Sequence, residues 1–235
     1  MNLFKHRHFQ YDIIIWAIRW YCKYGISYRE LKEMLHERGV NVDHSTIYRW
    51  VQKYAPEMEK RLKWHWRPKL GVSWQVDETY IKVKGKWVYL YRAIDKEGNT
   101  VDFHLSTRRN AKSAYRFLSK ALKGLKDWQR PPTINTDKAP SFIKAIKRLK
   151  KEGECSSNLY HRRVKYMNNR IEADHGKLKR LINPVRGFKS LKTARATIKG
   201  FEVMYMFKKG QFDFWKYGQG LKGEIRLITD ALLGF

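Results

Sequence analysis

The chain has 235 residues, with 50 Lys and Arg against 22 Asp and Glu, a formal net charge of +28 at pH 7. Hydrophobic residues make up 43% and aromatic residues 14%, enough to bury a core, so intrinsic disorder does not account for the charge. Such an excess destabilises a compact fold unless a polyanion neutralises it, and a phosphate backbone is the usual partner. The composition therefore favours a nucleic-acid-binding protein, with a solvated basic surface or a ribosome-associated protein as the alternatives.

Neither the cysteines nor the apolar runs suggest a metal framework or a membrane. Cys22 and Cys155 have no CxxC or Cys/His spacing, which argues against a zinc site and a disulfide framework. The apolar run at residues 13–18 spans six residues, too few for a signal-peptide core or a membrane span. We expect a cytoplasmic protein without a membrane partner.

The first part of the chain has helical periodicity. Residues 11–24 predict one helix, and the capping-box pattern of Ser27 and Glu30 opens a second, which stops at Gly39. Asp43 caps a third helix at residues 44–54, which Pro56 ends. Three short helices, the last one polar and basic, are typical of a helix-turn-helix domain, which we place at residues 1–56. A generic three-helix bundle is the alternative.

The third helix has one apolar side, formed by Ile47, Trp50 and Val51. Its other side is polar, and there we expect contacts to DNA. The predicted DNA-binding residues of this helix are Ser45, Thr46, Tyr48, Arg49 and Lys53. Residues 57–71 lose the periodicity and contain Pro68 and Gly71, so we interpret them as a basic linker.

Beyond the linker the pattern changes to strands. Residues 73–83, 86–95 and 100–106 are rich in β-branched and aromatic residues, and short polar turns separate them. There follow a helix at 111–122, a strand at 132–137, a helix at 142–151 capped by Ser141, a strand near Leu159 and a helix at 168–182. This β-β-β-α-β-α-β-α order predicts an α/β sheet with helices on its faces, a domain that we place at residues 72–210. We expect the helical run at residues 190–209 to pack against that sheet. The tail at 211–235 completes the core or forms a subunit contact.

Three acids stand at informative places in these elements. Asp77 lies in the first strand, Asp137 ends the 132–137 strand, and Glu172 begins the last helix of the sheet domain. Each has a structural alternative. Glu78 competes with Asp77 from the opposite face of its strand, and Asp137 is also a common turn residue.

For Glu172 the alternative is a carboxylate that stabilises the start of its helix. Asp174 competes with Glu172, but it lies about 200° round the helix, whereas His175 and Lys179 share the face of Glu172. His175 is a phosphate contact or a simple helix-surface histidine. Residues 162–199 hold twelve Lys or Arg against two acids, which predicts a DNA-facing surface that includes Lys179 and Arg180.

A family resemblance rests on these motifs, Trp74-Gln-Val-Asp77-Glu-Thr-Tyr-Ile, Asn135-Thr-Asp137 and Asn169-Arg-Ile-Glu172-Ala-Asp-His-Gly-Lys-Leu-Lys179-Arg. Together with the leading helices, the chain resembles a bacterial insertion-sequence transposase of the DDE class, most like the IS-six family. The resemblance implies a ribonuclease-H-like catalytic domain. It also implies a homodimer or higher oligomer, associated with the nucleoid, that binds the terminal inverted repeats of its element, acts on target DNA and forms cointegrates.

The chemistry of the acids agrees with that resemblance. Carboxylate oxygens are the ligands that Mg²⁺ or Mn²⁺ prefers, and two such ions about 3.5–4 Å apart can serve the attacking and the leaving oxygen of a phosphodiester. We therefore expect Asp77, Asp137 and Glu172 to be the catalytic residues and to hold two ions per site. A non-catalytic helix-turn-helix protein and a metal-dependent nuclease without strand transfer are the alternatives.

Overall fold

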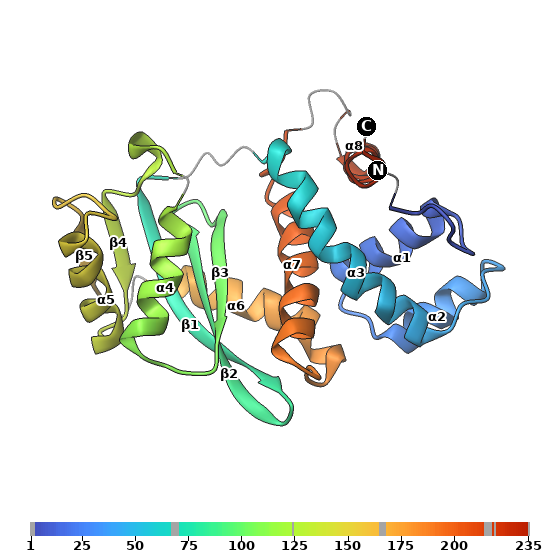
Figure 1. Ribbon diagram of the computed structural model, residues 1–235, viewed down its shortest axis with the longest axis horizontal. Helices are drawn as coiled ribbons and strands as arrows, with labels where there is room; N and C mark the ends of the chain where they lie inside the picture. Colours follow the sequence, from blue (N-terminus) through green and yellow to red (C-terminus); the bar gives the residue numbers. More distant parts are fainter. Residues whose placement is uncertain are drawn as a thin grey trace. The chain divides into compact units, whose positions relative to one another are not determined.

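In a computed structural model, the chain forms two compact units (Figure 1). One consists of Met1–Arg67 and Leu178–Phe235, and the other of Pro68–Lys177. The structure describes residues 3–66, 71–123, 125–164, 168–213, 218 and 220–234. The predicted linker residues 67–70 and the predicted tail residues 214–217, 219 and 235 lie outside this description.

The second unit is built on a mixed sheet in the order β3-β2-β1-β4-β5. Strands β1 (Ser73–Val83), β2 (Lys86–Asp95) and β3 (Thr100–Ser106) are antiparallel, as short hairpin turns require. Strand β4 (Thr133–Thr136) runs parallel to β1, and β5 (Tyr160–Arg163) runs parallel to β4. The sequence predicted this element order, and the sheet has the ribonuclease-H-like arrangement.

Alternation along the strands gives the sheet two different faces. The side chains of Trp74, Val76 and Ile134 point into a buried core, which they share with Phe117 of α4 (Ala111–Leu122) and Phe142 of α5 (Pro140–Lys151). Figure 1 shows α4 and α5 on this face of the sheet and the start of α6 (Asn169–Ile182) on the opposite face. A short 3₁₀ turn, η2 (Asp127–Gln129), precedes β4.

The predicted capping of α5 by Ser141 is wrong. The helix begins at Pro140, a favourable first residue because proline has no N–H to satisfy there. The N-cap position belongs to Ala139, which makes no side-chain cap. Instead, the carboxylate of Asp137 accepts the N–H of Ala139 at 2.9 Å, so the acid and the start of the helix are fixed together.

The first unit begins with the three predicted helices, α1 (Tyr11–Lys23), α2 (Tyr28–His36) and α3 (His44–Leu62). The capping box of α2 is formed: Ser27 accepts the N–H of Glu30, whose carboxylate accepts the N–H of Ser27. At the start of α3, the Asp43 carboxylate accepts the N–H of Ser45 at 2.8 Å. Both caps satisfy N–H groups that a helix start otherwise leaves without partners.

Helix α3 does not end before Pro56, as predicted, but continues through it to Leu62. A proline inside a helix loses one hydrogen bond and costs about 3 kcal/mol. Tyr54, Ala55 and Met58, together with Leu62, are nearly fully buried, and this burial offsets the cost. The linker prediction is therefore wrong for residues 57–65, which form the end of α3 and the 3₁₀ turn η1 (Lys63–His65).

Two carboxyl-terminal helices complete this unit, α7 (Leu191–Lys208) and α8 (Gly220–Leu233). Helix α7 packs against α1 and α3, and Gly200 allows a close approach, since a Cβ there would lie 2.5 Å from Sγ of Cys22. Residues 190–209, which we expected on the sheet, thus contribute to the helical core. Residues 178–210, which we assigned to the catalytic domain, cluster with the amino-terminal helices.

The described part of the tail also belongs to the helical core. In α8, Leu227, Ile228 and Leu232 are buried against the other helices of the unit. A buried ion pair joins Glu224 to Arg19 at 2.7 Å, and Lys23 lies 2.6 Å from the same carboxylate. Among the residues that the structure describes, no helix is long and apolar enough to cross a membrane.

Candidate catalytic and DNA-binding sites

The register of the sheet brings Asp77 and Asp137 to the same level. Parallel pairing joins Trp74 to Ile134 and Gln75 to Asn135. Continued two residues further, this register would set Asp77 opposite Asp137, which directly follows β4, at the usual strand spacing of about 4.8 Å. Asp77 continues the face of Gln75, away from the core that contains Val76.

The surroundings of Asp77 hold its carboxyl group in a proton-binding state. The side chain is 17% exposed, and Nδ1 of His175 lies 3.8 Å from its Oδ2. Burial, followed by the negative charges of Glu78, Asp137 and Glu172, raises the pKa of Asp77 to about 7. The predicted acids therefore lie close enough to repel one another electrostatically, which is the condition in which a bound cation is most strongly favoured.

Asp137 combines a structural role with its place beside Asp77. Its hydrogen bond to the N–H of Ala139 is the turn interaction that we gave as the alternative interpretation. The positive end of the α5 dipole also stabilises a carboxylate at this point. These interactions hold the Asp137 carboxylate in place, and its negative charge still acts on Asp77.

Helix α6 separates Glu172 from its competitor Asp174. Ile171, Asp174 and His175 are buried, whereas Glu172 is exposed. Asp174 forms a buried ion pair with Arg92 of β2, 2.7 Å between Oδ2 and Nη1. Asp174 is therefore committed to neutralising a buried guanidinium, and Glu172 remains the available carboxylate of this helix.

His175 is not the helix-surface residue that we gave as one interpretation. Its side chain is almost fully buried and faces Asp77 rather than solvent. We predicted that His175 and Glu172 share one face of the helix. The two residues lie three positions apart, but His175 is buried and Glu172 is exposed, so they share that face only in part. The imidazole thus belongs to the surroundings of Asp77.

Glu78, the competitor of Asp77, points to the other face of β1. Its side chain is 4% exposed and pairs with the guanidinium of Arg109. Burial raises the pKa of Glu78 and the positive charge of Arg109 opposes that rise. This pairing gives Glu78 a structural partner and leaves Asp77 as the strand acid on the α6 side.

The donor set is suited to a hard divalent cation, because it consists of carboxylate oxygens on two adjacent strands and a facing helix. The raised pKa of Asp77 is the second observation in favour, since burial and the nearby negative charges that raise it both disfavour a bare carboxylate, and a cation would relieve that effect. Within the described residues, however, no three Asp, Glu, His or Cys side chains already stand together at metal-binding distance. Binding would therefore draw the acids together.

The predicted DNA-binding residues lie on the outside of the helical unit. Arg49 and Lys53 are exposed on α3, and Ser45, Thr46 and Tyr48 are partly buried there. Further along the chain, Arg180 is exposed and Lys179 is partly buried in α6. None of these side chains belongs to the buried core of the unit.

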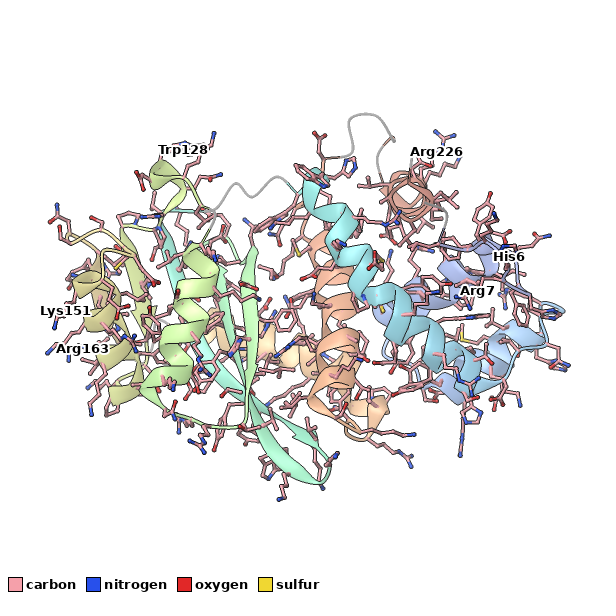
Figure 2. The ribbon with its side chains drawn as sticks, in the orientation of Figure 1. His6, Arg7, Trp128, Lys151, Arg163 and Arg226 are labelled. Atoms are coloured by element: carbon pink, nitrogen blue, oxygen red, sulfur yellow. The ribbon has the colours of Figure 1, made fainter. Side chains whose placement is uncertain are left out.

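Basic side chains also project from the sheet unit. Figure 2 shows Lys151, at the end of α5, and Arg163, in β5, extending away from the ribbon, and both are exposed. Trp128 of η2 extends from the same unit and is among its most exposed aromatic residues. Exposed cations and exposed aromatic rings are both typical of nucleic-acid-binding surfaces.

Sequence reasoning missed the basic partners of the acids, Arg92 and Arg109. Arg92 left a signal, because it is the one charged residue between Trp87 and Ile94 in an otherwise apolar and aromatic strand. A charge in such a strand requires a buried partner. Arg109 left no such signal, since it lies in a polar loop between β3 and α4.

Comparisons with known proteins agree with this geometry. Residues 71–211 match the family model of a DDE domain, and residues 8–129 match that of the IS66 transposase family. The chain is 43% identical over 233 residues to the Staphylococcus aureus transposase for the insertion sequence-like element IS431mec, covering 97% of this chain and 99% of that protein. It is equally similar to the Staphylococcus aureus transposase for the insertion sequence element IS257 in transposon Tn4003, with the same coverage.

Solved structures with a similar arrangement are integrase core domains. The catalytic core domain of HTLV-2 integrase in complex with magnesium aligns with a TM-score of 0.43 at 20% identity, over 57% of this chain and 86% of that one. The catalytic core domain of BIV integrase aligns with a TM-score of 0.42 at 15% identity, over 64% and 87%.

Proposed function

The chain belongs to the bacterial insertion-sequence transposases of the DDE class, and we propose that Asp77, Asp137 and Glu172 are its catalytic acids. It is a DNA transposase, an enzyme that cuts and joins DNA strands, and enzymes of this family depend on metal ions. We propose that this chain uses two Mg²⁺ or Mn²⁺ ions per site. The alternatives to Asp77 and Glu172 are disfavoured because Glu78 and Asp174 each have an arginine partner.

One observation carries the assignment above the others. Burial and the negative charge of Glu78, followed by the charges of Asp137 and Glu172, raise the pKa of Asp77 to about 7. The acid that follows β4 and the acid of α6, 60 and 95 residues after Asp77 in sequence, thus both act on the carboxyl group of the β1 acid. A fold that served only to bind DNA would gain nothing from placing mutually repelling carboxylates in a basic protein.

The residues around the acids have separable roles in the proposed reaction. Bound divalent ions would supply activation of the attacking hydroxyl and charge stabilisation on the leaving oxygen. Asp77 holds a proton near neutral pH and must release it to become a ligand. The Ala139 N–H orients the Asp137 carboxylate, and His175, 3.8 Å from Asp77, stabilises the Asp77 carboxylate whenever its imidazole is protonated.

We extend the proposal to the DNA partners. The α1–α3 helices would recognise the terminal inverted repeats, and the acid site would free a 3′ end and join it to target DNA in a cointegrate-type reaction. Two ends must be held at once, which favours a homodimer or a higher oligomer on DNA. The buried, free cysteines and the DNA substrate favour the bacterial cytoplasm, at the nucleoid.

Replacing each acid tests the catalytic assignment. Asp77→Ala, Asp137→Ala and Glu172→Ala are expected to abolish Mg²⁺-dependent cleavage of a labelled element end, while binding of the same DNA in EDTA is retained or strengthened. Binding is retained because these residues hold the metal rather than the phosphates, and the loss of a negative charge favours a polyanion. Glu78→Gln is the matched control from the opposite face of β1 and is expected to keep cleavage.

The products distinguish the competing functions. Cleavage with joined product supports the transposase. Cleavage without joining identifies a nuclease, and neither product in wild-type protein identifies a non-catalytic DNA-binding protein. A triad variant with near-normal cleavage shows that its residue is misassigned, and Glu78 and Asp174 are then the acids to replace next.

A further inference from the structure

The helical unit contains a cavity of about 850 Å³ beside the predicted recognition helix. Four segments line it: the start of α2 with the residues before it, one side of α3, the segment from Asn183 to Lys189, and the first turns of α7 at Thr193 and Thr197. The third segment comprises the 3₁₀ turn η4 (Asn183–Val185) and the loop after it. The cavity is large enough for a piece of sugar–phosphate chain rather than a lone ion.

The walls of the cavity are fixed by contacts within the unit. Gln52 of α3 donates to the hydroxyl of Thr197 in α7 at 2.8 Å. Near the start of α2, a Cβ added at Gly25 would lie 2.8 Å from the carbonyl oxygen of Arg180, so the last turn of α6 packs closely against this point. The cavity is therefore largely preformed.

The charges lining the cavity are suited to an anion. Arg29, Arg186 and Lys189 line it and are exposed, and the acidic residue among the lining, Glu30, caps α2. Within the described residues, no ion pair engages any of these three cations. Lys189 lies over the ring of Tyr48, 5.6 Å from its centroid.

Three helix starts lie at the cavity. Tyr28 is the first residue of α2, His44 is the first of α3, and Lys189 immediately precedes the N-cap of α7. The partial positive charge of a helix start attracts an anion. Carboxylates already cap α2 and α3, so the start of α7, which the uncharged Ser190 caps, is the one whose dipole adds to the cationic side chains.

The backbone of Arg186 adds an independent observation. Its φ is +53°, in the left-handed region where a non-glycine residue is strained by about 1–2 kcal/mol. A glycine would adopt this conformation without cost, yet the chain carries a long cationic side chain here, at the wall of the cavity. Strain that is retained at one position is a reason to look for a function of the side chain.

Helix α3 presents two adjacent faces. Ser45, Tyr48 and Gln52 line the cavity, at spacings of three and seven residues. Each of these residues is followed in sequence by one that does not line the cavity, namely Thr46, Arg49 and Lys53. This second set lies about 100° further round the helix axis. A helix that inserts the second face into a DNA groove therefore carries the cavity at its flank, where the strand backbone runs.

We propose that this cavity is a clamp for the DNA backbone that flanks the groove, with Arg186 and Lys189 as phosphate contacts. The proposal rests on the proposed recognition of the element end by α3. It assigns a DNA-binding role to residues 183–189, a segment distant in sequence from the helix-turn-helix.

The test uses the full chain in EDTA, with fluorescence anisotropy of a labelled element-end duplex and an unrelated duplex of equal length, over a NaCl series. Arg186→Gly should weaken binding of both duplexes by the same factor and reduce the slope of log K against log [NaCl] by about one. Its melting temperature should be equal to or above that of the wild type, because glycine removes the strain. Misfolding would therefore not explain the loss.

Lys222→Ala is the matched control, since it removes an exposed charge from α8, outside both the cavity and the predicted DNA-facing surface at residues 162–199. Equal losses in the two variants, or an unchanged slope for Arg186→Gly, would overturn the clamp. A wild-type stabilisation by inorganic phosphate that Arg186→Gly lacks, with DNA binding unaltered, would also overturn it in favour of a small-anion site. If the wild type binds the two duplexes equally, the proposed recognition of the element end is wrong. Weaker binding of both duplexes by Arg186→Gly would support the clamp even then.

Discussion

At the scale of single residues, Asp77 shows how a position that we propose to be catalytic costs stability. The folded protein binds the Asp77 proton more tightly than the unfolded chain does, because burial and neighbouring negative charges raise the pKa from 3.8 to about 7. Stability is therefore lost as the pH rises from about 4 to about 7, where the folded state must give up a favoured proton. A cation at the site would reverse this loss by replacing the proton.

Asp77→Asn removes the penalty and predicts a stability gain that depends on pH. Each pKa unit corresponds to about 1.4 kcal/mol, and 1 kcal/mol moves the melting temperature of a chain of this size by about 2–4 °C. In EDTA, the variant should melt at least about 2 °C above the wild type at pH 8, and the difference should disappear near pH 4. Thermal denaturation at both pH values checks this, with Asp127→Asn, which removes an exposed carboxylate of η2, as the control. A gain that is the same at pH 4 and pH 8 would contradict the electrostatic explanation.

The sequence pointed to the three acids as candidates, an assignment that stays a prediction, whereas the residues that surround them could not be predicted. Asp77 and Asp137 lie in strand patterns whose order implies adjacency. The partner of Asp174 is Arg92, however, and that pairing depends on the register of β1 against β2 and on how α6 crosses the sheet. No local pattern carries that information. The burial of His175 could not be predicted for the same reason. The helical period shows which residues share a face of α6, but not which part of the fold packs against that face.

At the scale of elements, alternating strands were easier to predict than helix ends. The bounds of β1, β2 and β3 follow from period-two patterns and tight turns such as Lys84-Gly85, where both residues have positive φ. The sequence prediction ended α3 too early, because a proline usually ends a helix and the apolar residues beyond Pro56 were not taken into account. Val51, Met58 and Leu62 continue the buried spacing through Pro56, and they pack with α7 and α8, which lie more than 120 residues later.

The two faces of α3 predict two kinds of DNA-binding defect. Substituting Thr46 or Arg49 with Ala should lower the preference for the element end over unrelated DNA, because base-edge contacts contribute about 1–3 kcal/mol each to discrimination. Variants on the cavity side should weaken both DNAs alike, since phosphate contacts carry little sequence information. Competition binding with both duplexes separates the two classes. Full end preference in the Thr46 and Arg49 variants would make these helices a packing or dimerisation module.

At the scale of the whole molecule, the chain has 28 more cationic than anionic side chains, so most of its Lys and Arg residues cannot pair with an acid of the same chain. Several acids are already engaged inside it, as Glu224 is with Arg19 and Asp174 is with Arg92. The exposed cations are therefore left with few partners of their own chain. Self-repulsion of this size opposes the compact state until salt or a polyanion screens it.

Salt and DNA should therefore stabilise the protein in ways that compete. Without DNA, the melting temperature should rise between about 50 and 500 mM NaCl, because the Debye length falls and the repulsion is screened. At low salt, an unrelated duplex at about 100 times its Kd should add about 2.7 kcal/mol of stability. That gain should vanish at high salt, where counterion release no longer favours binding. Thermal denaturation over a grid of NaCl and duplex concentrations measures both effects, and an uncharged polymer at equal mass controls for crowding. A melting temperature that falls with salt in the absence of DNA would show that the charges already compensate one another within the fold.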